Sequence, residues 1–174
     1  AVDAGAAKSV PGVVEVVEIP SGVAVVAETT WAALQGREAL AVTWDEGRAE
    51  TRGTPDLVRE YRDLLETPGQ TARAVGDADA ALSGAAKTLE ATFLFPYLAH
   101  APMEPLNCVV RLSEDGCEIW AGDQFQTVDQ ANAAAAAGLD PRKVKIHTLL
   151  AGGSFGRRAN PPSDYIVEAV HTAR

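Results

Sequence analysis

Histidine and cysteine are scarce in this sequence, with three histidines and two cysteines among 174 residues. His100, His147 and His171 are scattered, with no His-x-x-x-His spacing, and the cysteines form no Cys-x-x-Cys pair. Metal sites built from side chains need such clustered ligands. The sequence therefore does not predict a metal ion held directly by the protein.

The two cysteines are also badly placed for a disulfide. A hairpin turning at Asp115-Gly116 would set Leu112 opposite Cys117, which leaves Cys108 out of register with its possible partner. We therefore expect two free thiols and no covalent link between distant parts of the chain.

Long apolar runs and an excess of positive charge are both missing. No stretch approaches the roughly 20 apolar residues that span a bilayer, and no charged start followed by an apolar segment marks a signal peptide. The net charge of −9 argues against nucleic acid as a partner, because binding to a phosphate backbone needs a basic face. The sequence indicates no compartment.

What is present is globular, with 47% hydrophobic residues. Strand-like runs rich in β-branched residues alternate with helical segments, which favours an α+β fold. We expect three parts: 1–45, 46–86 as a connection with one main helix, and 87–174, which holds a mixed sheet with flanking helices. The expected strands cover 13–19, 23–27, 41–44, 87–97, 106–112, 117–121 and 143–150, and the expected helices cover 31–40, 54–66, 127–137 and 161–174.

A glycine-rich loop, 152–156, follows the strand predicted at 143–150 and ends in Arg157-Arg158. Glycines let a backbone turn sharply and bring several N–H groups together. Such a concavity suits an anion, and arginine can grip a phosphate with two parallel hydrogen bonds. The loop is a candidate cradle for a phosphate- or oxo-bearing cofactor, or else an ordinary turn whose arginines are solvated or paired with carboxylates.

Three loops, 100–105, 122–126 and 152–158, each follow a predicted strand of the last part and would form one binding rim. Gln124 offers an amide for an oxo group, or else caps the following helix. Glu104 lies between Met103 and Pro105, where an apolar loop would raise its pKa for acid–base work, unless it is ion-paired. We expect His100 to be a core or loop histidine, and Phe155 either plugs the loop to the core or borders a substrate pocket.

The order of these motifs resembles the large subunit of the molybdenum hydroxylases, the xanthine oxidase and aldehyde oxidase family, and especially its isoquinoline 1-oxidoreductase β-subunit branch. Residues 1–45 resemble the end of the α/β-hammerhead domain of that family, and 87–174 the first part of its molybdopterin-binding domain. Four segments carry the resemblance: 11–33, which includes Pro11-Gly12-Val13-Val14-Glu15; Ala99-His100-Ala101-Pro102-Met103-Glu104-Pro105; Ile119-Trp120-Ala121-Gly122-Asp123-Gln124; and Gly152-Gly153-Ser154-Phe155-Gly156-Arg157.

The resemblance implies an oxidoreductase that hydroxylates aldehydes or N-heterocycles with oxygen from water. It implies a molybdenum-pterin dinucleotide cofactor, and a small [2Fe-2S] iron–sulfur subunit as the partner that takes the electrons. Gln124 would hydrogen-bond an oxo ligand, and Phe155 and Glu104 would border the substrate pocket. The implied cofactor contacts are Gln124, Gly152, Gly153, Ser154, Phe155, Gly156 and Arg157, with no direct metal ligand.

Two features depart from the family pattern. The middle glycine of the loop is Ser154 here, and the family's catalytic glutamate, which stands in a Gly-x-Gly-Glu context, has no counterpart among the 174 residues. We therefore expect a piece of a longer subunit, inactive and without cofactor by itself. The alternative hypothesis is a non-enzymatic α+β module that binds an anionic ligand at 152–158.

Overall fold

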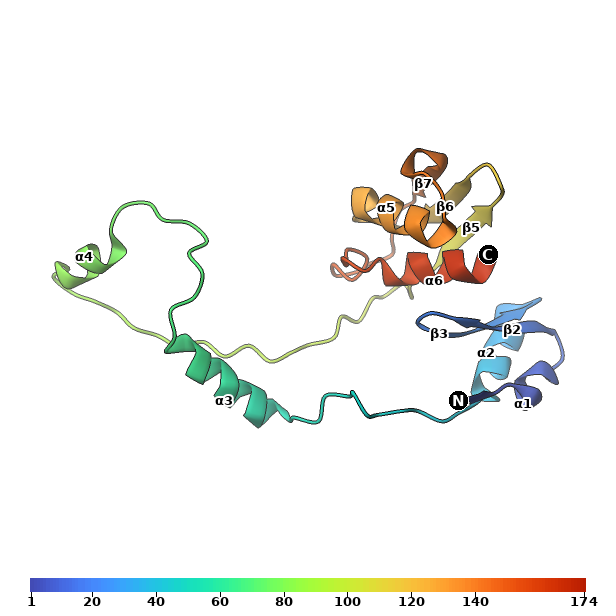
Figure 1. The fold of residues 1–174 in the computed structure, drawn as a ribbon, viewed down its shortest axis with the longest axis horizontal. Helices are drawn as coiled ribbons and strands as arrows, with labels where there is room; N and C mark the ends of the chain where they lie inside the picture. The colour runs from blue at the N-terminus through green and yellow to red at the C-terminus, as the bar shows by residue number, and fades with distance from the viewer. The chain divides into compact units, whose positions relative to one another are not determined.

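The computed structural model describes all residues from Ala1 to Arg174. The chain divides into two units, one made of Ala1–Thr43 with Leu98–Arg174 and the other of Trp44–Tyr97. The first unit contains every strand, and Figure 1 shows its elements at both ends of the colour range. The domain boundaries proposed from the sequence, at 45 and 86, stay a prediction.

The N-terminal segment of the first unit is a small α+β arrangement. Its central element is an antiparallel hairpin of β2 and β3, against which helix α2 packs, and a second, two-residue pair joins β1 to β4. The Thr29 side chain accepts a hydrogen bond from Ala32 N at 3.1 Å, so Thr29 is the cap that starts α2. The elements are β1 (Val2–Asp3), α1 (Gly5–Lys8), β2 (Val13–Ile19), β3 (Gly22–Ala27), α2 (Thr30–Glu38) and β4 (Ala41–Val42).

The C-terminal segment of the first unit is built on a mixed three-stranded sheet in the order β5-β6-β7. β5 and β6 are antiparallel and place Leu112 opposite Cys117, which confirms the predicted register. β6 and β7 are parallel, so the predicted α+β class with a mixed sheet is confirmed. The elements are β5 (Cys108–Leu112), β6 (Cys117–Ala121), α5 (Gln126–Ala137), a 3-10 turn (Pro141–Lys143), β7 (Val144–Thr148) and α6 (Asp164–Ala173).

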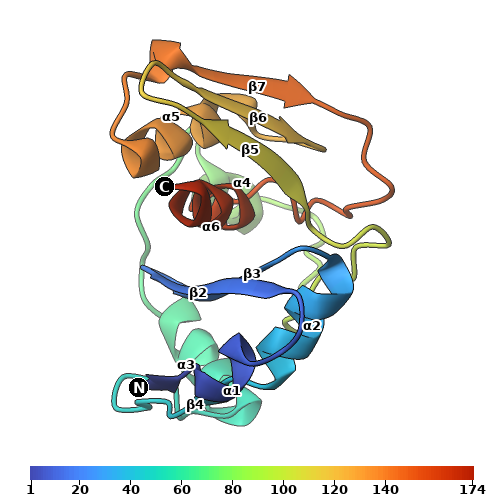
Figure 2. The ribbon, with the colours of Figure 1, turned by 90° about the vertical axis from the view of Figure 1, so that its right-hand side faces the viewer.

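Helices α5 and α6 cover one face of this sheet, and α6 lies between the sheet and the β2–β3 hairpin (Figure 2). α5 ends at Gly138, whose φ of 72° is the left-handed conformation that glycine adopts most easily at a helix end. Ser21 Oγ donates to Glu168 Oε1 at 3.0 Å and so connects the hairpin to α6.

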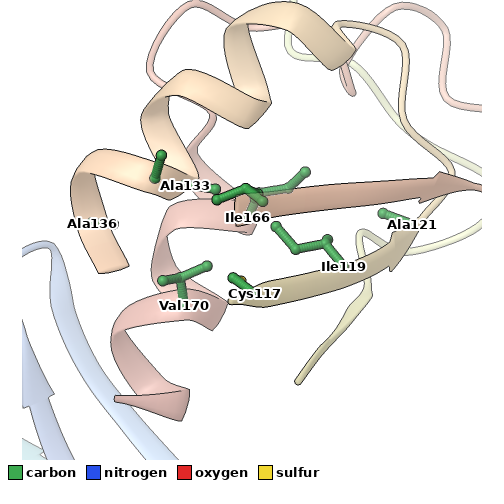
Figure 3. Close-up of a cluster of buried hydrophobic side chains, with 9 residues drawn as sticks. Cys117, Ile119, Ala121, Ala133, Ala136, Ile166 and Val170 are labelled. Atoms are coloured by element: carbon green, nitrogen blue, oxygen red, sulfur yellow. The ribbon is translucent and has the colours of Figure 1, made fainter. Parts of the chain in front are cut away.

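The core of the C-terminal segment lies between β6 and the two helices (Figure 3). Ile119 of β6 and Ile166 and Val170 of α6 are fully buried. Alanines on α5 bring that helix close to the strand, because a methyl group takes little space. The buried cluster is Cys117, Ile119, Ala121, Ala133, Ala134, Ala136, Val144, Ile166 and Val170.

Both cysteines are free thiols near this core. Burial raises the pKa of Cys108 to about 11, so this thiol stays protonated at neutral pH.

The second unit contains helices α3 (Thr54–Leu65) and α4 (Ala78–Ser83) and no strand. The strand predicted at 87–97 is wrong, because these residues are extended but have no neighbouring strand to hydrogen-bond with. Alternation of apolar residues predicted a half-buried strand, whereas Leu89 and Phe95 are 92% and 82% exposed. A groove of about 390 Å³ separates residues 94–97 from one side of α3 within this unit.

None of the helices combines the length and the apolar character that crossing a lipid bilayer demands.

Ile119→Ala removes a side chain that is completely buried between β6 and α6. We expect the free energy of unfolding to fall by about 2–5 kcal/mol, the range for truncating a large aliphatic core residue. Urea unfolding of the protein, followed by tryptophan fluorescence, measures this.

Val109→Ala is the matched control, because Val109 lies on the neighbouring strand β5 and is 63% exposed. We expect this control to change the free energy of unfolding by no more than about 0.5 kcal/mol. Equal losses from the two variants would contradict the assignment of the core to the helix-covered face.

Candidate functional site

The parallel pairing of β6 with β7 brings two polar loops together. The register sets Ala121 beside Thr148, and Leu149 N continues the ladder by donating to Ala121 O at 2.8 Å. Parallel strands end at the same edge of a sheet, so the chain leaves both strands there. The loop 122–125 and the glycine-rich loop 152–156 therefore begin side by side.

Gln124 and Ser154 make the contact between these two loops. Ser154 Oγ donates a hydrogen bond to Gln124 Oε1. Gln124 is not the cap of α5: Phe125 occupies the N-cap position, and its N–H donates to Asp123 Oδ1 at 2.6 Å. The Gln124 side chain is thus held by the neighbouring loop and not by the helix that follows it.

The loop 100–105 joins the same edge, although no strand precedes it. Met103 N donates to Gly153 O at 2.9 Å, and Glu104 Oε2 accepts from Gly152 N at 2.6 Å. All three loops predicted to form one rim are therefore in contact, and it is the glycine-rich loop that holds 100–105 in place.

Glu104 is a tightly held carboxylate. Its Oε1 accepts from Asn107 Nδ2 and from Arg158 Nη2, both at 2.9 Å. The Asn107 amide, the Gly152 N–H and the Arg158 guanidinium hold the pKa of Glu104 below its usual value. The expectation of a raised pKa was wrong, because the loop supplies donors that stabilise the charge; the ion-paired alternative is the one observed.

The two arginines after the loop are paired with carboxylates. Arg157 Nη1 donates to Asp164 Oδ1 at 3.2 Å. Arg158 is 1% exposed and stacks near the Tyr165 ring, with 5.9 Å between its guanidinium carbon and the ring centre. Both guanidinium groups are therefore occupied by carboxylates, so a ligand of this loop would contact mainly backbone atoms.

The backbone of the glycine-rich loop is shaped by close approach and positive φ. A Cβ at Gly152 would lie 2.8 Å from Glu104 Oε2, and Gly153 and Gly156 have φ of 93° and 92°. The backbone N–H groups of residues 153–156 donate no hydrogen bond to another group of the protein. Four consecutive N–H groups without a protein acceptor can receive an oxygen-rich ligand.

Phe155 lies at the outer side of this loop. It is 69% exposed, so it does not plug the loop to the core, and its φ of 54° is unusual for a residue with a Cβ. With His100 and the residues around it, Phe155 lines a pocket of about 350 Å³. His100 is exposed and is not a core residue.

Behind the loops lies a buried polar cluster, which we define as Asp123, Asp129, Arg158 and Tyr165. Nothing in the sequence pointed to it beyond a charged residue in an alanine-rich helix. Burial first, and then the neighbouring Asp123 carboxyl, raise the pKa of Asp129 to about 6. Burial and the carboxylates of Asp123 and Asp129 raise the pKa of Tyr165 to about 12. The cluster's buried atoms without a hydrogen-bond partner are Asp123 Oδ2, Asp129 Oδ1 and Oδ2, Arg158 Nε and Nη1, and Tyr165 Oη.

Comparison with known proteins finds a matching family and similar proteins. Residues 64–174 match the family described as "Molybdopterin cofactor-binding domain". The chain is 34% identical over 187 residues to the beta subunit of isoquinoline 1-oxidoreductase from Brevundimonas diminuta, covering 99% of this chain and 23% of that protein. It is 29% identical over 174 residues to a nicotinate dehydrogenase subunit of Pseudomonas putida, covering 100% of this chain and 14% of that protein.

A solved structure shares the fold. Quinoline 2-oxidoreductase from Pseudomonas putida 86 superposes with a TM-score of 0.63 at 17% sequence identity, covering 100% of this chain and 28% of that chain. The chain thus spans about a quarter or less of the curated relatives named here. Those relatives are named as subunits, which is consistent with assembly with other chains.

Asp129→Asn tests the buried polar cluster through the pH dependence of stability. Between the ordinary aspartate pKa near 4 and the folded value near 6, the folded state keeps a proton that the unfolded state has lost. The free energy of unfolding contributed by Asp129 therefore falls as pH rises through this window, by about 2–3 kcal/mol in total. Asparagine removes this penalty.

We expect the variant to gain stability relative to the wild type from pH 4 to pH 7, measured by urea unfolding at each pH. Asp115→Asn, an exposed aspartate in the β5–β6 turn, is the control for loss of a carboxylate elsewhere. A difference between Asp129→Asn and wild type that does not change with pH would contradict the assignment.

Proposed function

Because the chain belongs to the molybdopterin cofactor-binding domain family, we propose that it forms one wall of the cofactor site in the large subunit of a molybdenum hydroxylase. The observation that carries the proposal is the placement of Gln124 and the glycine-rich loop at one edge of the sheet, in direct contact. Such an edge, where two parallel strands end, is a common place for ligands in folds that contain β–α–β crossovers.

The residues present fit a large, oxygen-rich cofactor. The N–H groups of 153–156 have no acceptor within the protein, and a side chain at Gly152 would collide with Glu104. Gly152, Gly153, Ser154, Phe155 and Gly156 would hold the cofactor by backbone contact. Arg157 supports them by closing the turn, since its N–H donates to Ser154 O at 3.0 Å.

The cofactor supplies the oxidation chemistry, and the chain binds and orients. Gln124 is exposed, and its amide nitrogen is free to donate to an oxygen of the cofactor. Phe155 borders the substrate, beside the pocket it shares with His100. Glu104 would contribute by fixing Gly152, because its two oxygens already accept three hydrogen bonds within the protein.

The whole protein would oxidise N-heterocycles or aldehydes with oxygen from water, and pass the electrons to a [2Fe-2S] subunit. Support for the N-heterocycles comes from the names of the similar proteins, which refer to isoquinoline, nicotinate and quinoline. A site built from backbone N–H groups and an apolar ring suits an aromatic substrate beside an anionic cofactor.

The alternative, a non-enzymatic module that binds an anion at 152–158, has less support. Such a module would need its arginines for the ligand, and both are committed to Asp164 and Glu104.

Gln124→Ala in the intact protein tests the proposal. Removing a donor that is aimed at the reacting centre should lower kcat/KM by roughly 100-fold, while the molybdenum content per protein, measured by elemental analysis, stays close to that of the wild type. Substrate oxidation is followed with an artificial electron acceptor.

Gln35→Ala is the control, because Gln35 is an exposed glutamine on helix α2. Normal turnover in Gln124→Ala with full molybdenum content would remove Gln124 from the site.

A further inference from the structure

We propose that Ser154 is a positioning residue that fixes the orientation of the Gln124 amide, so that the amide nitrogen and not the oxygen faces the cofactor. This inference rests on the proposed function of Gln124. It concerns the position at which the glycine-rich loop departs from the Gly-Gly-Gly pattern that it otherwise resembles.

The contact between Ser154 and Gln124 is a hydrogen bond from a hydroxyl to an amide oxygen. Ser154 Oγ and Gln124 Oε1 are the two atoms that meet, and the residues are separated by 30 positions along the chain. Ser154 is 7% exposed, whereas the Gln124 residue is exposed. A buried hydroxyl therefore holds one end of an amide whose other end faces outward.

The hydrogen-bonding capacity of the two groups decides which end is held. A buried hydroxyl proton needs an acceptor, and Gln124 Oε1 is the one acceptor that Ser154 Oγ has in the structure. If the amide were flipped, its nitrogen would donate to Oγ and the hydroxyl proton would lose its acceptor. The buried hydroxyl thus favours the orientation with Oε1 inward.

The outward group is then a pure donor. Gln124 Nε2 makes no hydrogen bond within the protein, and because the residue is exposed its N–H groups are available to donate to a ligand. A donor oriented before the ligand arrives has no reorganisation cost when the ligand binds. A glycine at 154 would leave the amide free to present either its oxygen or its nitrogen.

The supports of Ser154 are independent of the ligand. Its carbonyl oxygen accepts from Arg157 N at 3.0 Å, and the loop before it is fixed by the bonds of Gly153 O to Met103 N and of Gly152 N to Glu104. The backbone at 154 therefore stays in place when the hydroxyl is removed, and the loss can be read as a loss at Gln124.

The test is a double-mutant cycle in the intact, cofactor-loaded protein, with Ser154→Ala, Gln124→Ala and the double variant. Loss of one hydrogen bond that orients the amide should lower kcat about three- to tenfold in Ser154→Ala, with KM little changed. In the Gln124→Ala background the same substitution should have no further effect, because its target is gone. Ser154→Gly also removes the hydroxyl, and it should give the same loss of kcat as Ser154→Ala.

A second measurement does not depend on turnover. Neutron diffraction from crystals of the intact protein distinguishes the amide nitrogen from the oxygen. We expect a single orientation with Oε1 toward Ser154 in the wild type, and two orientations or a disordered amide in Ser154→Ala. Molybdenum content should be equal in both.

Each failure has its own meaning. A full effect of Ser154→Ala in the Gln124→Ala background, or an unchanged amide in Ser154→Ala crystals, would overturn the inference while leaving the proposed function intact. Normal turnover in Gln124→Ala would instead remove the proposed role of Gln124, on which the inference rests.

Discussion

The candidate site depends on the direction of one strand pair. β6 and β7 run parallel, so the chain leaves both at the same sheet edge, and two segments 30 residues apart come into hydrogen-bond contact there. Had β7 been antiparallel to β6, the glycine-rich loop would lie at the opposite end of the sheet from Gln124. The crossover that reverses the chain between these strands contains α5, and its buried alanines let that helix pack closely on β6.

A second interaction fixes the third loop on this edge. The buried Arg158 guanidinium and the Gly152 N–H share the Glu104 carboxylate, so two hydrogen bonds hold a residue whose loop follows no strand. The glycine at 152 is required by this arrangement, because the carboxylate occupies the space that a Cβ would take. Burying the Arg158 guanidinium is costly, and its ion pair with Glu104 offsets part of that cost.

The local features of the fold were predictable because their causes lie within a few residues. The Cys117 register followed from the turn at Asp115-Gly116, and the end of α5 followed from Gly138. The strand at 87–97 was wrong because alternation describes which residues are apolar and cannot supply a partner strand.

The environment of the site was harder to predict. The sequence left Glu104 open between a carboxyl with a raised pKa and an ion-paired residue, and the group with the raised pKa is Asp129 instead. The first donor to Glu104 is Asn107, three residues along the chain, and the others, Gly152 and Arg158, lie 48 and 54 residues away. Asp129 is instead buried beside another carboxyl. The distant donors and the burial of Asp129 are set by the fold, which no local pattern describes. The resemblance to a known family can be recognised from the sequence alone, because its motifs are short segments in a fixed order.

The buried position of Arg158 has a mechanical consequence for the loop before it. Moving the glycine-rich loop outward would break the bond from Gly152 to Glu104, and it would strain the ion pair whose guanidinium is wholly enclosed. Local opening of this segment would thus expose charge as well as backbone, at a higher free-energy cost than exposing backbone alone. Despite its glycines, the loop is anchored at Gly152 by Glu104 and at Ser154 by Arg157.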